Sequence, residues 1–310
     1  MTDIRHLTRR EIDADRWDAC VEESGLGIAF GYSHYLDIMA DDWDGLVVGD
    51  YEAVLPVPTR TKWGIRYAYP PRFMGPHPVY SDTGHKPPIA EFIRTVGVLF
   101  PFSDIQIAAS SHETDLPHAV RRNHTLSLKR TYEEIRAGYR ATCRNLLSGA
   151  VKEGIVVEKG ANPDEAIGRA ARDGMMKGCN RDDLARFRML CRELTRRNAC
   201  LTLAAHSQDG ETLSMAVFFT TGRRIHYMAS WTGDAGRKTG ASRMVIDAVV
   251  REHAGTGCIL DFVGSDIPGI ASYFEGFGAE PTDYLLIRQN RLPSWLAWVK
   301  GPLPETGIRD

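Results

Sequence analysis

The residue types best suited to hold a charged ligand stand together at the predicted start of a helix. They are Arg237, Lys238, Thr239, Gly240, Ala241 and Ser242. A short glycine-containing loop that opens a helix leaves several backbone N–H groups without partners inside that helix. These groups, with the positive end of the helix dipole, attract anions and suit a pyrophosphate. The stretch therefore predicts the site of a phosphate-bearing donor.

The elements around this stretch are predicted by their residue patterns. Residues 223–230 are rich in residues that suit a pleated surface, and they predict a strand. Apolar residues fill most of the circumference of a predicted helix over residues 242–253. A strand over residues 259–263 and a helix over residues 268–275 follow. Residues 237–242 are therefore expected to form the loop between a strand and a helix.

The two halves of the chain predict the same order of elements. In the first half we expect helices over residues 15–23 and 32–39, strands over 45–49, 53–60 and 65–69, a helix over 89–99 and a strand over 104–108. In the second half we expect helices over residues 132–153, 163–176 and 182–197, then strands over 200–206, 212–220 and 223–230. The recurring order predicts two copies of one α+β unit. Residues 121–125 are polar and unpatterned, which places the boundary there and predicts domains at residues 1–125 and 126–310.

The composition of the 310 residues is ordinary for a globular protein, with 43% hydrophobic and 25% charged residues. A net charge of -2 gives no reason to expect DNA or an anionic membrane as a partner. The six cysteines are scattered and lack the spacing typical of zinc ligands, so we expect no metal. Neither a signal peptide nor an apolar run of about 18 residues is apparent. These features predict a soluble cytoplasmic protein without membrane insertion.

Motifs of the second half resemble a known family. Arg237, Gly240 and Ser242 match the GNAT acyltransferase pattern Arg/Gln-x-x-Gly-x-Gly/Ala, with Ser242 in place of the last small residue. Three segments resemble FemAB-like transferases and stand in the expected order. They are residues 132–157, 260–265 and 273–279, while residues 69–76 are the best local match in the first half. The resemblance implies two tandem GNAT-like domains, each a mixed, mainly antiparallel sheet flanked by helices, with the donor site in the C-terminal domain.

The resemblance implies transfer of an acyl or aminoacyl group to an amine, which forms an amide. Members of the family take this group from acyl-CoA or from aminoacyl-tRNA, and the acceptor is often a peptidoglycan precursor peptide. Our leading hypothesis is an N-acyltransferase that uses acyl-CoA, because the loop suits a pyrophosphate and the net charge is close to zero. The alternative is an aminoacyl-tRNA-dependent aminoacyltransferase that acts on a cell-wall or small peptide. A non-catalytic ligand-binding protein of the same fold is the third hypothesis.

The resemblance also implies roles for individual residues. In GNAT folds the strand that carries Ser230 splays from the strand that carries Asp261, which frees a backbone N–H of residues 228–230 to stabilise an oxyanion. Tyr273 lies where GNAT enzymes often keep a tyrosine that protonates the leaving thiolate; packing in the core is its alternative role. Asp261, at the end of its strand, is a candidate base, or it caps the turn that follows.

The sequence departs from the family pattern at Glu275, where many FemAB-like proteins carry Lys. A cation at this position would help to hold a phosphate-bearing donor, whereas a carboxylate repels one. We therefore expect Glu275 to disfavour a phosphate-bearing donor.

A basic segment opens the second domain. At helical spacing, Arg136, Arg140 and Arg144 share one face. This face predicts a phosphate surface for a nucleotide-linked acceptor or for tRNA, or else a solvated face paired with acids. Tyr69 and Arg72, in a proline-rich loop, either line an acceptor cleft between the domains or belong to a rigid connector.

Overall fold

The computed structural model describes residues 3–82, 87–264 and 266–293. The chain forms two compact units, one of residues 1–122 with 283–310 and the other of residues 123–282. This division differs from the expected one because the chain returns to the first unit after Thr282. Ser265, the last residue of one predicted motif, lies outside the described residues. No helix in the described ranges is long and apolar enough to cross a membrane.

The first unit contains one sheet and three α-helices among its described residues. Its strands are β1 (Ile4–Thr8), β2 (Asp42–Val48), β3 (Ala53–Lys62), β4 (Ile65–Ala68), β5 (Tyr80–Ser81), β6 (Phe102–Ile107) and β13 (Glu280–Asn290). Its helices are α1 (Ala14–Glu23), α2 (Ser33–Met39) and α3 (Ile89–Leu99), with 3-10 turns at Ala29–Gly31 and Ser111–Glu113. Neighbouring strands are antiparallel except β4 and β6. Phe92, Ile93 and Val96 of α3 are buried in the core of this unit.

The second unit also contains one sheet. Its strands are β7 (His118–Ser127), β8 (Val156–Lys159), β9 (Cys200–His206), β10 (Thr212–Thr221), β11 (Arg224–Thr232) and β12 (Ile259–Asp261). The strand order is β7, β12, β11, β10, β9, β8, and only β11 and β12 are parallel. The helices are α4 (Tyr132–Ala137), α5 (Ala141–Lys152), α6 (Pro163–Arg172), α7 (Arg181–Arg196), α8 (Asp234–Thr239), α9 (Ala241–His253) and α10 (Pro268–Glu275).

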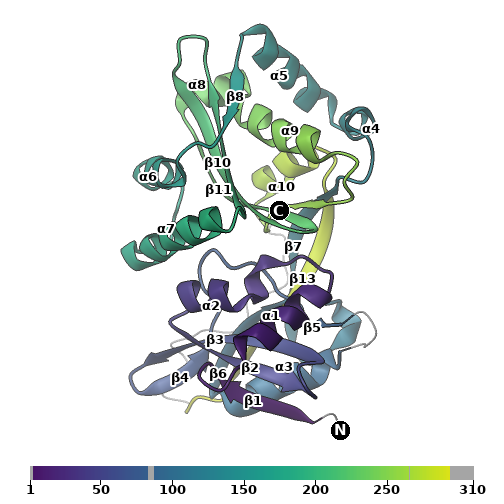
Figure 1. Cartoon of the computed structure of the whole chain (residues 1–310), viewed down its shortest axis with the longest axis vertical. Helices are drawn as coiled ribbons and strands as arrows, with labels where there is room; N and C mark the ends of the chain where they lie inside the picture. The colour runs from purple at the N-terminus through teal and green to yellow at the C-terminus, as the bar shows by residue number, and fades with distance from the viewer. Residues whose placement is uncertain (1–2, 83–86, 265, 294–310) are drawn as a thin grey trace. The chain divides into compact units, whose positions relative to one another are not determined.

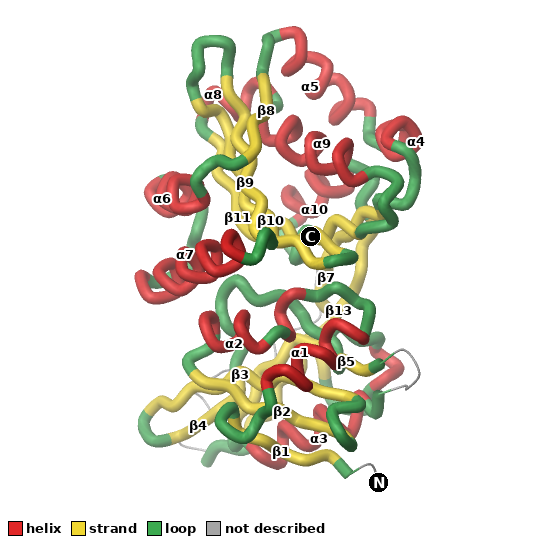
Figure 2. Tube along the Cα trace, in the orientation of Figure 1, coloured by secondary structure: helices red, strands yellow, loops and turns green. Residues whose placement is uncertain are grey.

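Helices cover both faces of this second sheet (Figure 1). Phe218 and Phe219 are neighbours on β10, so their side chains point to opposite faces. The Phe218 ring lies 5.3 Å from that of Tyr227, in the core that includes α5 and α9. The Phe219 ring lies 5.7 Å from that of Phe187 on α7. The helices α6 and α7 therefore cover one face, and α5 and α9 cover the other (Figure 2).

Both units follow one plan, which confirms the predicted repeat and the α+β class. The first unit runs β1, α1, α2, β2, β3, β4, α3, β6, with β5 inserted before α3. The second runs β8, α6, α7, β9, β10, β11, α9, β12, with α8 inserted before α9. In each unit the last of these strands is parallel to the third strand of the meander. The patterns used above do not predict β1 and β8.

Two local predictions differ from the structure. The two units divide between Arg122 and Asn123, within the expected residues 121–125, but these residues lie in strand β7 and are not irregular. The single helix expected over residues 132–153 is divided into α4 and α5, with Gly138 capping the end of α4. The N–H of Arg140 donates to the carbonyl of Gly276 at 2.9 Å, so a contact with the end of α10 holds the chain where the helix is interrupted. The three arginines therefore do not share one helical face.

Candidate functional site

Strands β11 and β12 pair over only part of β11. The parallel register joins Arg224 to Ile259, Ile225 to Leu260 and His226 to Asp261, where β12 ends. Beyond this point β11 continues to Thr232 without β12 beside it. No described strand pairs with residues 227–232 on that edge, and side chains 227–230 are only partly buried.

A bulge lies in the same part of β11. On β10, Val217 faces Ala229 and Phe218 faces Tyr227, so Met228 has no residue opposite it. Side chains three residues apart on a regular strand point to opposite faces, and a bulge changes this alternation. Ser230 lies near enough to Tyr227 to lower the pKa of that phenol, against the effect of burial, which raises it to about 12. Tyr227 and Ser230 therefore share a face.

Tyr273 of α10 belongs to the same cluster of side chains. Its ring packs edge-on against Phe274 and Phe277, at centroid distances of 5.8 and 5.7 Å. Its hydroxyl is buried and makes no hydrogen bond of good geometry with a described residue. Burial raises the pKa of Tyr273 and nearby Tyr227 raises it further, while Ser242 lowers it. The structure thus places Ser242 and Tyr227 near the buried hydroxyl of Tyr273, and Ser230 near Tyr227.

The predicted donor loop is not a loop over its whole length. Arg237, Lys238 and Thr239 form the last turn of α8, and Ala241 and Ser242 form the first turn of α9. Gly240 links the two helices with a φ of 77°, a left-handed conformation that glycine adopts at little cost. A Cβ added at Gly240 would lie 3.1 Å from the backbone oxygen of Leu146. The glycine is therefore required both by its backbone angle and by its close contact with α5.

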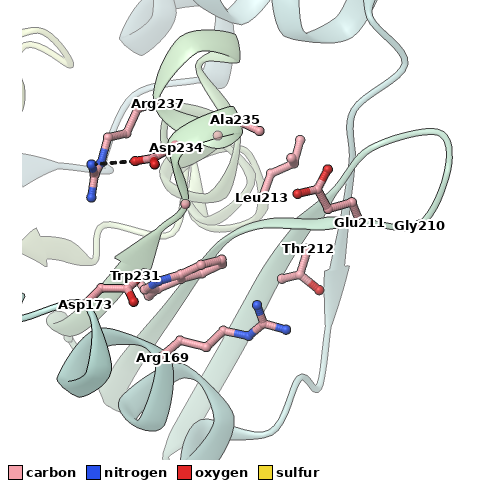
Figure 3. Close-up of a pocket in the computed structure, with 12 residues that line it drawn as sticks. Arg169, Asp173, Gly210, Glu211, Thr212, Leu213, Trp231, Asp234, Ala235 and Arg237 are labelled. Atoms are coloured by element: carbon pink, nitrogen blue, oxygen red, sulfur yellow. Dashed lines mark hydrogen bonds and ion pairs between the residues drawn. The ribbon is translucent and has the colours of Figure 1, made fainter.

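A cavity of about 740 Å³ lies beside the end of β11 (Figure 3). Its lining includes Arg169 and Asp173 of the α6 region, Trp231, and Asp234 and Arg237 of α8. The indole N–H of Trp231 donates to Asp173 at 2.6 Å, and the Arg169 guanidinium lies 4.7 Å from the centre of the Trp231 ring. Of the six predicted donor residues, Arg237 is in this lining. Trp231 is not among the residues predicted for the site, although it lies near the end of the strand before the predicted loop.

Asp261 is fully engaged by its neighbours. Its carboxylate accepts from Asn123 Nδ2 at 2.8 Å, from Arg224 Nη1 at 2.7 Å and from the N–H of Val263 at 2.8 Å. The Arg224 and Asp261 side chains are only 14% and 7% exposed. A carboxylate with these three partners holds the end of β12 in place. The contacts favour the structural role of Asp261 over that of a base.

His226, in register with Asp261, is fully buried. Burial lowers the pKa of its imidazole to about 4, so the ring is neutral at pH 7 and is a weak base.

Two of the three arginines of the basic segment, Arg140 and Arg144, form hydrogen bonds within the second unit. Arg140 Nη2 donates to Glu275 at 2.5 Å, so the charge of Glu275 is compensated. Arg144 donates to the carbonyls of Ala137 and Tyr139 at the end of α4. These contacts favour the structural interpretation of Arg144. Arg136 and Arg144 also line a smaller cavity of about 310 Å³.

The two acceptor candidates of the proline-rich loop lie in the first unit. Arg72 is exposed. The Tyr69 hydroxyl accepts from the N–H of Asp41 at 3.1 Å, and the Arg60 guanidinium lies 4.3 Å from the centre of its ring. Their role in an acceptor cleft stays a prediction. Across the described ranges, no group of three His, Cys, Asp or Glu side chains is arranged to hold a metal.

No protein-family model matches the sequence, and no curated protein matches it. Solved structures match it over nearly its whole length. FemX has a TM-score of 0.63 and 12% identity, covering 92% of this chain and 97% of FemX. L-PGS from Bacillus licheniformis has a TM-score of 0.55 and 11% identity, covering 91% and 93%. A tandem GNAT protein from the clavulanic acid biosynthesis pathway has a TM-score of 0.53 and 12% identity, covering 94% and 100%. The chain therefore has the fold of FemAB-like tandem GNAT proteins, as its motifs predict.

Proposed function

We propose that the chain transfers an acyl group from acyl-CoA to the amine of a small-molecule or peptide acceptor, in its second unit. The observation that carries this proposal is the part of β11 beyond His226, which has no β12 beside it and contains the bulge at Met228. A thioester carbonyl that lies along this edge can accept a hydrogen bond from a backbone N–H of residues 228–230. Such a donor stabilises the oxyanion that forms when the amine attacks.

Tyr273 is our proposed acid. Burial raises the pKa of its phenol, so the hydroxyl keeps its proton at neutral pH. Collapse of the tetrahedral intermediate breaks the C–S bond, and the phenol can give its proton to the departing sulfur. The proton that the attacking nitrogen loses on forming the amide passes to solvent and restores the phenol. Tyr227 lies near this hydroxyl, and Ser230 lies near Tyr227. Asp261 acts in this scheme as a positioning residue at the end of β12, through Arg224 and Asn123.

The donor's phosphates are proposed to lie at the junction of α8 and α9, which contains Arg237 to Ser242. Glycine at position 240 leaves the N–H groups at the start of α9 without a side-chain cap. The fold shared with FemX and with the tandem GNAT protein, which is described as solved without AcCoA, supports a CoA thioester as the donor. An acyltransferase that acts on amines is consistent with each of these features.

The test is direct binding followed by turnover. Isothermal titration of acyl-CoA thioesters into the full chain should give a saturable signal, and amine-dependent thiol release should follow. Gly240→Trp should abolish both, because the new side chain meets Leu146 and fills the junction. Gly257→Trp is the matched control, because Gly257 has the same φ of 77° as Gly240 and open space around its Cβ position. If no acyl-CoA binds, acyl-CoA is not the donor. If acyl-CoA binds but no thiol is released, the result favours a non-catalytic ligand-binding protein.

An aminoacyl-tRNA donor is the second candidate. The cavity beside Arg136 and Arg144 supports it, because it presents two arginines to a phosphate. The pairing of Arg140 with Glu275 and of Arg144 with helix carbonyls weakens it. Retention of tRNA on a filter that falls steeply with salt would favour this candidate. No retention at low salt would count against it.

A further inference from the structure

Helix α7 carries a cysteine on the face that packs on the sheet. Its buried residues recur at helical spacing and are Phe187, Leu190, Cys191 and Leu194. The Phe187 ring lies 5.7 Å from that of Phe219 on β10, so this face of the helix covers the strands. Cys191, one turn after Phe187, is fully buried. Its thiol therefore points to the sheet and is shielded from solvent.

A second cysteine lies on the sheet below this face. Cys200 begins β9 and is paired in register with Phe219 on β10. Residues that are directly opposite in an antiparallel pair point to the same face, so Cys200 points towards α7 as Phe219 does. Leu203, an odd number of positions further along β9, belongs to the core on the α9 face, as this alternation requires. Cys200 is only partly buried. The sheet therefore presents a partly exposed thiol to the helix that carries Cys191.

The turn between α7 and β9 brings these two side chains together. The N–H of Ala199 donates to the carbonyl of Leu194 at 2.7 Å, so the chain reverses directly after the helix. The thiols of Cys191 and Cys200 are close enough to form a hydrogen bond with each other. Two cysteines from consecutive elements thus form one cluster, which we name the α7–β9 dithiol.

The surroundings make the two thiols chemically different. The hydrogen bond with Cys191 lowers the pKa of the Cys200 thiol, against the effect of burial, and Thr195 and Thr202 lower it further. The same hydrogen bond raises the pKa of Cys191, and burial raises it again. The thiolate is the form of cysteine that attacks a disulfide, so Cys200 reacts first with a soluble reagent. Cys191 is positioned to react with Cys200 in a second step.

We propose that the α7–β9 dithiol is a site of oxidation by low-molecular-weight disulfides, which joins Cys191 and Cys200 by a disulfide bond. The Cys200 thiolate attacks one sulfur of the reagent, forms a mixed disulfide and releases one thiolate, which takes a proton from water. Cys191 then attacks the sulfur of Cys200, and its proton passes to the second departing thiolate. Two protein thiols are oxidised, and one reagent disulfide is reduced to two thiols. The new bond ties α7 to the start of β9.

Peptide mapping of the full chain after treatment with glutathione disulfide tests this site. Trypsin cleaves after Arg192, Arg196 and Arg197, so the two cysteines fall in separate peptides unless a disulfide joins them. The native protein should give the joined peptide, with a mass about 2 Da below the sum of its two parts because two hydrogens are lost. Dithiothreitol should separate the two parts again.

Single variants test the order of the two steps. Cys191→Ser removes the second thiol, so Cys200 should accumulate as a mixed disulfide with glutathione. Cys200→Ser should leave Cys191 unmodified, because the Cys191 thiol is shielded from solvent. Cys258→Ser replaces another partly buried cysteine outside the dithiol and should give as much joined peptide as the native protein. Thermal melting checks that each variant folds.

Three results would overturn this inference, and the first two need no variant. One is recovery of both cysteines in alkylated form from the treated native protein, without the joined peptide. Another is a joined peptide that forms only after the protein is unfolded in urea. The third is modification of Cys191 in Cys200→Ser to the same extent as in the native protein. The inference goes beyond the proposed function and is independent of it, because none of these measurements involves an acyl donor.

Discussion

Arg140 and Glu275 form an ion pair with 2.5 Å between Nη2 and Oε2, which joins the start of α5 to the end of α10. Arg140 also donates to Ser272 at 3.1 Å. The carboxylate that departs from the family pattern is thus matched by a cation from another helix. The sequence predicts that the Glu275 carboxylate repels a phosphate-bearing donor. The ion pair with Arg140, which forms only in the folded chain, reduces this repulsion.

From this pair we predict that Arg140 affects donor affinity only when Glu275 is present. Arg140→Gln should weaken CoA binding by about threefold to tenfold, because it uncovers the charge of Glu275 near the donor phosphates. Arg140→Gln combined with Glu275→Gln should restore the affinity. The pair is 51% and 33% exposed, so its own effect on unfolding free energy should be below about 1 kcal/mol. Titration of CoA into the four members of this cycle measures the coupling; additive losses contradict it.

Tyr273→Phe should lower kcat for thiol release by about a hundredfold or more and leave KM nearly unchanged. The variant keeps the ring that packs on Phe274 and Phe277 and removes only the hydroxyl. Tyr132→Phe, which removes a hydroxyl bound to Asp247, is the control for loss of a partly buried phenol outside the reacting atoms. Equal kcat values for Tyr273→Phe and the native protein would show that this tyrosine only packs in the core.

Asp261→Asn should lower the free energy of unfolding more than it lowers the rate of acyl transfer. The substitution leaves Arg224, which is only 14% exposed, without its ion-pair partner, and breaking such a buried pair costs about 3 kcal/mol or more. Urea denaturation of the full chain should report this loss. Asp261→Leu with Arg224→Met removes both charges and should recover much of the stability. A fully stable Asp261→Asn protein that has lost all turnover would instead point to Asp261 as the base.

His226 predicts a dependence of stability on pH. Burial lowers the pKa of its imidazole to about 4 in the folded chain, below the ordinary value of 6.5. The unfolded chain therefore binds more protons between these values, and stability falls as the pH drops from about 6.5 towards 4. Between pH 7 and pH 4 the contribution of His226 should fall by about 3 kcal/mol. Denaturation curves of the native protein and of His226→Gln at pH 7 and pH 5 check this.

The variant should be less stable at pH 7 but should lose less stability on acidification. His77 of the first unit, whose pKa burial also lowers to about 4, titrates in the same range and is present in both proteins. The difference between the two proteins therefore isolates His226. Parallel pH dependences for the native protein and the variant would contradict this assignment.

Elements with strong local patterns were predictable from the chain. The helices over residues 89–99 and 268–275 and the strand over 200–206 have the predicted bounds. Each has apolar residues at the period of its own structure, which depends only on neighbours in sequence. The tandem repeat and its GNAT-like plan followed from the order of such elements and from short motifs.

Elements whose polar residues have distant partners were not predictable in this way. In the sequence, Asn123 is part of a polar stretch that is typical of a linker. In the structure its buried side chain donates to Asp261 and accepts from the N–H of Gly264. The return of the chain to the first unit after Thr282 likewise depends on pairing of β13 with β6. These contacts join residues more than a hundred positions apart, and no local pattern encodes them.

The sequence by itself determined that a glycine at position 240, between basic and small residues, precedes a helix that suits an anion. Tertiary structure decided which cations near that helix are already neutralised. Arg140 is paired with Glu275 of another helix, and Arg144 donates to the carbonyl of Tyr139. Spacing along the chain identifies residue types, whereas charge compensation of this kind depends on distances between helices, so only the folded chain shows that Glu275 is paired with Arg140.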